Sequence, residues 1–158
     1  MARQFHIQTA RLSLAALTAF ALIALLVGDA RSQDDKQGEK PSPLDGAWKL
    51  IEQKNGDAQE YQKLPEGTQM IKYVTGGRFI WTIASEGRLQ SAAGGKCTVD
   101  KDKYTESIDY VHGDGQAPLV GKSFDFTWKI DGGIWLHTGT LKIDGQEIKI
   151  DEKWERCK

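Results

Sequence analysis

The stretch "SFDFTWKI" at residues 123–130 alternates strictly between large apolar and polar side chains. Phe124, Phe126, Trp128 and Ile130 fall on one side of this alternation. A period of two predicts a β-strand with one face buried, because successive strand side chains point to opposite faces. The C-terminal "EIKIDEKWERCK" (147–158) follows the same rule. The decisive signal is therefore that of a sheet with one apolar face.

Six further segments complete a predicted set of eight strands. They are "AWKLIEQ" (47–53), "TQMIKYVT" (68–75), "RFIWTIAS" (78–85), the less regular "RLQSAAGGKCTV" (88–99), "KYTESIDY" (103–110) and "GIWLHTGTL" (133–141). Most links are short and rich in Gly and Asp, which is typical of turns between antiparallel neighbours. We expect an all-β, eight-stranded antiparallel up-and-down barrel without a long helix.

Two links are longer, 54–67 and 111–121, and the first has room for a helical turn at "AQEYQK" (58–63). The facing of 68–75 stays open, because Met70 and Val74 compete with Ile71 and Tyr73 for the inner side.

The first 32 residues read as a secretory signal peptide. A basic start precedes an uncharged apolar run from Leu12 to Gly28, and small residues follow it. We expect cleavage after Ser32, or else after Ala30, and export to the periplasm or the medium. A retained membrane anchor is the alternative. Residues 33–44 are predicted to be a flexible leader, and 45–158 the folded domain.

Charge argues against a nucleic-acid partner. Three of the 21 basic residues and one of the 22 acidic residues lie within 1–32, which leaves 18 basic and 21 acidic side chains. Both signs are scattered along the predicted strands. A phosphate-binding surface needs a basic patch instead. Contact with a membrane is expected only through an uncleaved signal segment.

Closure of the barrel requires the first strand, 46–53, to pair with the last, 147–156. Trp48 would then lie near Trp154 or Arg156 and fill one end of the barrel. Gly46 would let the backbone pass closely, and a guanidinium over the Trp48 ring would add a cation–π attraction.

Gly46-Ala47-Trp48 and the terminal Arg156 resemble the G-x-W motif and the terminal arginine of lipocalin-type (calycin) barrels. The succession "GAW", "GGRF", "KYTESI" and "EKWER" across residues 45–157 is most similar to small exported bacterial lipocalin-like domains of unknown function. The resemblance implies a closed barrel that holds a small ligand. No helix follows the last predicted strand, in contrast to true lipocalins.

Cys97 and Cys157 are the two cysteines of the chain. In an exported protein they are expected to form a structural disulfide. Lipocalins often have a similar bridge from the fourth strand to the C-terminal segment, so the resemblance implies the same pairing. A redox-active or metal-binding thiol pair is the alternative, but no C-x-x-C motif supports it.

Polar residues on inward-facing positions are the candidates for chemistry. Glu152 shares a face with Trp154 and Arg156, and Glu106 shares one with Tyr104. Each could anchor a ligand, or could be satisfied internally; for Glu152 the expected partners are Arg156, Lys72, Arg78 or Arg88. His112 and His137 have no second ligand at useful spacing. We therefore predict no metal, no cofactor and no enzymatic activity.

The sequence favours a non-catalytic exported barrel that binds a small, mainly apolar molecule. The expected ligand contacts are Trp81, Tyr104, Trp128, Thr138 and Glu152. The alternative is an envelope or extracellular interaction module with a side-chain-filled barrel, which would contact another protein through 54–67 and 111–121. An interior cavity of a few hundred Å³ would favour the first function.

Overall fold

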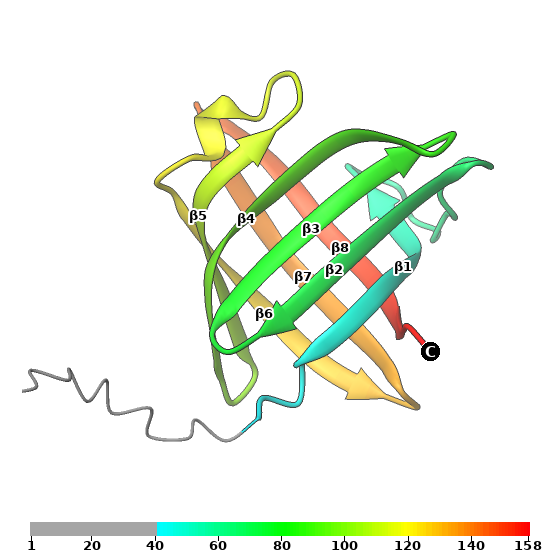
Figure 1. The fold of residues 1–158 in the computed structure, drawn as a ribbon, viewed down its shortest axis with the longest axis vertical. Coiled ribbons are helices and arrows are strands. Elements are labelled where there is room, and N and C mark those ends of the chain that lie inside the picture. Colours follow the sequence, from blue (N-terminus) through cyan, green and yellow to red (C-terminus); the bar gives the residue numbers. More distant parts are fainter. Residues whose placement is uncertain (1–40) are drawn as a thin grey trace, which may run out of the picture. The chain divides into compact units, whose positions relative to one another are not determined.

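The computed structural model describes residues 41–158, which form a closed barrel of eight antiparallel strands in up-and-down order (Figure 1). The strands are β1 Gly46–Asn55, β2 Thr68–Thr75, β3 Arg78–Ser85, β4 Arg88–Asp100, β5 Lys103–His112, β6 Ser123–Asp131, β7 Ile134–Ile143 and β8 Gln146–Arg156. Within the described range the only helical segment is the 3-10 turn η1, Ala117–Leu119. The predicted fold class is confirmed, whereas the predicted signal peptide lies outside the described residues.

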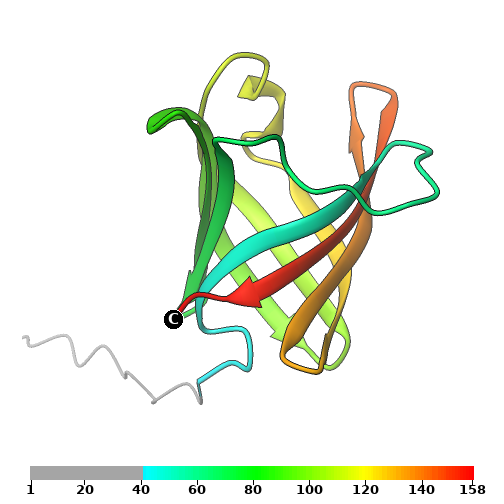
Figure 2. The same cartoon turned by 90° about the vertical axis from the view of Figure 1, so that its right-hand side faces the viewer.

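The barrel closes through antiparallel pairing of β1 with β8, which lie side by side in Figure 2. Trp48 stands opposite Arg156, and Leu50 stands opposite Trp154. A bulge between Leu50 and Glu52 interrupts the register. Such bulges bend a strand and increase its local twist, which a closed barrel requires. The two ends of the domain are thus neighbouring strands, as the sequence predicted.

Strand direction gives the barrel two different ends. β1 begins and β8 ends at one of them, which we call the base; the turns 76–77, 101–102 and 132–133 lie there too. The opposite end, the rim, carries the long links 56–67 and 113–122.

The base is filled by Trp48 and the residues around it. The Trp48 Nε1–H donates to the Leu44 carbonyl oxygen at 2.8 Å. The Arg156 guanidinium carbon lies 4.2 Å from the centroid of the Trp48 ring. Its nitrogens donate to the carbonyl oxygens of Asp45 at 2.6 Å and Pro43 at 2.9 Å. The arginine therefore fastens the segment before β1 across the base of the barrel.

Gly46 makes this arrangement possible, because it has φ +136° and a Cβ at this position would overlap the Arg156 guanidinium. Leu44, in contrast, corrects the predicted boundary of the leader, since it is fully buried in the core. The buried Leu44 side chain joins the end of this polar segment to the base, together with the hydrogen bonds from Trp48 and Arg156.

The link 56–67 contains no helix at residues 58–63, contrary to the expectation from sequence. Gln62 instead forms an isolated antiparallel bridge with Gln53 of β1. The Tyr61 hydroxyl donates to the Asp151 carboxylate of β8 at 2.6 Å, and this hydrogen bond is the main cause that raises the pKa of Tyr61 to about 12. The link is thus held by its contacts with β1 and β8.

The expected disulfide is absent from the structure, since both cysteines are free. Cys97 of β4 is buried and packs in the core, whereas Cys157 lies just beyond β8 and is exposed. A bridge requires Cβ atoms about 4 Å apart and facing each other. The structure instead holds the two thiols apart, with Cys97 in the core and Cys157 exposed. The prediction of a Cys97–Cys157 bridge was therefore wrong for this structure.

Candidate functional site

The interior of the barrel can be followed from the base to the rim, and the inward-pointing side chains of β2 mark its middle. Lys72 and Val74 of this strand are buried, while Tyr73 between them is 49% exposed. Met70 packs against the core from the same side of the strand. The sequence left open which face of β2 points inward. In the structure Lys72 lies on the inner face, so its charge is inside the barrel.

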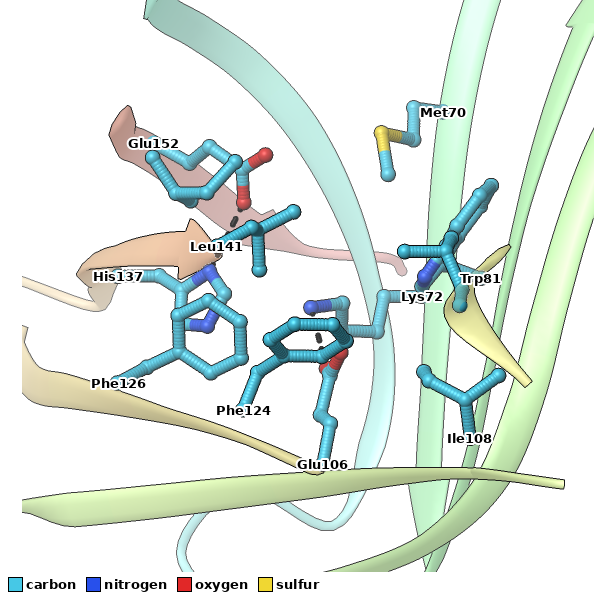
Figure 3. Close-up of a pocket in the computed structure, with 12 residues that line it drawn as sticks. Met70, Lys72, Trp81, Glu106, Ile108, Phe124, Phe126, His137, Leu141 and Glu152 are labelled. Atoms are coloured by element: carbon cyan, nitrogen blue, oxygen red, sulfur yellow. Dashed lines mark hydrogen bonds and ion pairs between the residues drawn. The ribbon is translucent and has the colours of Figure 1, made fainter. Parts of the chain in front are cut away.

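A cavity of about 100 Å³ lies above this level, toward the rim (Figure 3). We call it the cup. Its wall is apolar: Met70, Trp81, Ile108, Leu119, Phe124, Leu141 and Ile150. Its floor combines Phe126 with four polar side chains: Lys72, Glu106, His137 and Glu152. Leu119 comes from η1, so the link 113–122 contributes to the wall.

The first polar pair of the floor joins β2 to β5. The Lys72 ammonium donates to Glu106 Oε1 at 2.7 Å, and both side chains are almost completely buried. The same ammonium lies over the rings of Trp154 at 5.0 Å, Trp135 at 5.3 Å and Tyr104 at 5.6 Å. Buried ions are tolerated when they are paired and hydrogen-bonded. Glu106 and the aromatic rings together provide such an environment for Lys72.

The second pair joins β7 to β8. His137 Nδ1 lies 2.8 Å from Glu152 Oε2, and the Trp154 Nε1–H donates to the same oxygen at 3.1 Å. Burial and the nearby Lys72 charge lower the pKa of His137. Burial alone would raise the pKa of Glu152, but the hydrogen bond and the charge of His137, the Lys72 charge and the hydrogen bond from Trp154 together outweigh it and leave that pKa lowered. The two side chains thus form a buried hydrogen-bonded pair between β7 and β8.

Of the five residues predicted as ligand contacts, two line the cup and three do not. Trp81 and Glu152 line the cup. Tyr104 is completely buried beside Trp135, at the base side of the floor. Trp128 packs half-buried against the core and does not line the cup.

Thr138 is exposed on the outer face of β7 and does not line the cup. The buried Trp135 fixes the phase of β7, and the period of two then turns His137 inward and Thr138 outward.

Sequence reasoning missed two partners of the floor. Lys72 was considered as an ion-pair partner of Glu152, but it binds Glu106, and His137 takes its place at Glu152. The alternation from Trp135 was a usable signal for His137, because it already placed the imidazole on the inner face. No comparable signal existed for Lys72. The other described histidine, His112, is exposed.

The chemistry available to the cup is limited to acid–base and hydrogen-bonding groups. Its lining contains no Ser, Thr or Cys, so the cup itself offers no aliphatic hydroxyl or thiol. Burial raises the pKa of the Cys97 thiol to about 11, and this thiol lies outside the cup. Among residues 41–158 no three His, Cys, Asp or Glu side chains are grouped to hold a metal ion.

Within the described part of the chain, no helix combines the length and the hydropathy needed to cross a membrane. Neither a family model nor a curated protein matches the chain.

Proposed function

We propose that this protein is an exported, non-catalytic barrel of the lipocalin-like type, whose cup binds a small, mainly apolar molecule. The observation that carries the proposal is the cup itself: seven apolar side chains around a cavity of about 100 Å³, above a polar floor. Ligand sites typically combine such apolar walls with a few polar groups. The G-x-W sequence and the terminal arginine support the lipocalin-like assignment.

The size of the cavity restricts the ligand. Pockets for drug-sized ligands have volumes of roughly 300–1,000 Å³, and an engineered apolar cavity of about 150 Å³ holds benzene. The cup, at about 100 Å³, is smaller than the few hundred Å³ set above as the mark of a ligand-binding barrel. It suits only a short chain or a single ring that extends toward the rim. Met70, Trp81, Leu141 and Ile150 are only partly buried, so solvent reaches the wall of the cup. The proposed ligand is accordingly much smaller than a fatty acid or a retinoid.

Trp81 provides the test, because it lines the cup and the other four tryptophans do not. Titration with short-chain and single-ring apolar compounds should give a saturable change in tryptophan fluorescence. Trp81→Phe should abolish this signal while ligand-induced shifts in the NMR spectrum persist. A response that is linear, or that is unchanged in Trp81→Phe, would argue against binding in the cup.

An interaction module is the second candidate, and the filled base favours it. Trp48, Trp135, Trp154 and Tyr104 leave the cup as a small remainder of the interior. In that case the links 54–67 and 111–121 would contact a protein of the envelope or the medium. The absence of any saturable response across the panel would favour this function over ligand binding.

A further inference from the structure

His137 has a buried nitrogen that no other group of the described chain satisfies. In residues 41–158 four buried side-chain atoms lack a hydrogen-bond partner: Tyr104 Oη, Trp128 Nε1, Trp135 Nε1 and His137 Nε2. Only His137 among these residues lines the cup. Its side chain is 1% exposed, and Figure 3 shows the imidazole turned from β7 into the barrel. The Phe126 ring packs against the imidazole with 4.2 Å between the centroids, and Nε2 itself is covered, so a ligand in the cup reaches this nitrogen by displacing a neighbouring side chain of the floor. A buried polar atom without a partner carries a desolvation cost that a ligand can remove.

The contacts of Glu152 determine which imidazole nitrogen carries the proton. Trp154 Nε1 can only donate, so the oxygen that it shares with His137 is an acceptor. His137 Nδ1 must then be the N–H that donates to this carboxylate. Because the pKa of His137 is lowered, Nε2 presents a lone pair and accepts a hydrogen bond. A ligand group that pairs with His137 Nε2 must therefore be a hydrogen-bond donor.

Charges around the imidazole restrict the donor further. Lys72 of β2, Glu106 and Tyr104 of β5, and Glu152 of β8 surround His137. A carboxylate ligand would offer no proton to Nε2 and would meet two glutamates. An ammonium ligand would lose its hydration in the cup beside the Lys72 charge, and both carboxylates that could compensate it already accept hydrogen bonds from Lys72, His137 and Trp154. A hydroxyl group can donate to Nε2 and accept from another donor, and it adds no charge.

We propose that the ligand of the cup is a small apolar alcohol or phenol whose hydroxyl donates to His137 Nε2 while its hydrocarbon part lies against the apolar wall. This inference rests on the proposed function and assigns the head group of its ligand. Glu152 acts as a positioning residue, since its carboxylate holds the imidazole in the tautomer that leaves Nε2 free to accept.

The test compares phenol with toluene, which have nearly the same size and differ in the hydroxyl. In NMR titrations of residues 33–158, phenol should bind about tenfold more tightly than toluene. The free protein should show an Nε2 signal typical of an unprotonated imidazole nitrogen. This signal should move on addition of phenol and stay in place with toluene. Benzoate and benzylamine, the charged single-ring probes, should both bind more weakly than phenol.

His137→Phe supplies the matched variant, because it keeps a ring at the floor and removes the acceptor. It should bind phenol and toluene with equal affinity. If this variant does not fold, the Nε2 signal of the unmodified protein decides the question by itself. Equal affinities in the unmodified protein, or a protonated Nε2, would overturn the hydroxyl assignment and leave the proposed function standing. Failure of every probe to bind would overturn both.

Discussion

The base and the cup are built from the same eight strands but are filled in opposite ways. At the base, Trp48 meets Trp135 edge-to-face at 5.4 Å, Trp135 packs 6.1 Å from Trp154, and Tyr104 closes the cluster 5.4 Å from Trp135. Toward the rim, mainly aliphatic side chains together with Trp81 and Phe124 surround a cavity, and several of them are partly exposed. Between them lie the two buried polar pairs.

This difference shows how an eight-stranded barrel can be stable and still retain a cavity. A barrel of this strand number has room for side chains alone or for one small ligand. Large rings at one end supply most of the apolar burial, and the other end can then remain unfilled.

Truncation of Trp135 should give the largest effect, because its side chain is completely buried at the centre of the base. Trp135→Ala should lower the free energy of unfolding by about 3–5 kcal/mol through lost burial and a new cavity. Leu141→Ala, in the partly exposed wall of the cup, should cost about 1 kcal/mol. Urea denaturation followed by circular dichroism measures both. Similar losses in the two variants would contradict the division between base and cup.

Removal of Lys72 tests the floor. Lys72→Met leaves Glu106 buried without its cation and should destabilise the barrel by about 3 kcal/mol. The double variant Lys72→Met/Glu106→Leu removes both charges and should recover stability to within about 1 kcal/mol of the unmodified protein, or exceed it. The double-mutant cycle measures this coupling. If the double variant were as unstable as Lys72→Met, the unpaired Glu106 charge would not be the cause of the destabilisation.

Acid should lower the free energy of unfolding through protonation of His137 and, at lower pH, of Glu152. Because the pKa of His137 is lowered in the folded barrel, the unfolded chain binds a proton there that the folded state does not. Stability should therefore fall below about pH 6.5, by at most about 1.4 kcal/mol per pH unit for one proton. Glu152, whose folded pKa is also lowered, adds a further loss as the pH falls through the range where carboxylates protonate.

Urea denaturation between pH 7 and pH 5 measures this slope, and a variant pair assigns it. His137→Gln should reduce the slope, while His112→Gln, at an exposed position, should leave it in place. Lys72, Glu106, Tyr104 and Glu152 surround His137 and remain unchanged in both variants. If the pH dependence of the unfolding free energy were unchanged in His137→Gln, it would come from another group.

Much of the fold was predictable because its signal is local. The alternation of Phe124, Phe126 and Trp128 needs only the geometry of one strand, and short turns between such strands imply antiparallel neighbours. The pairing of β1 with β8 followed from closure. Part of the cup could also be predicted from the sequence: Trp81 and Glu152 were named as ligand contacts, and both line the cup.

One error occurred where residues distant in sequence had to be matched, and one residue was placed without following the phase of its strand. Cys97 and Cys157 were paired because an exported chain with two cysteines commonly bridges them, but the structure holds one in the core and the other exposed. Thr138 was assigned to the cup although the phase of its own strand turns it outward.

The sequence by itself determined an eight-stranded closed sheet with rings inside, since hydrophobic period and turn chemistry are properties of each short segment. Only the tertiary structure decided that Lys72 binds Glu106 and that His137 binds Glu152. The reason is physical. The partner of a buried charge depends on the register and the level at which two distant strands face each other across the interior, and no single segment carries that information.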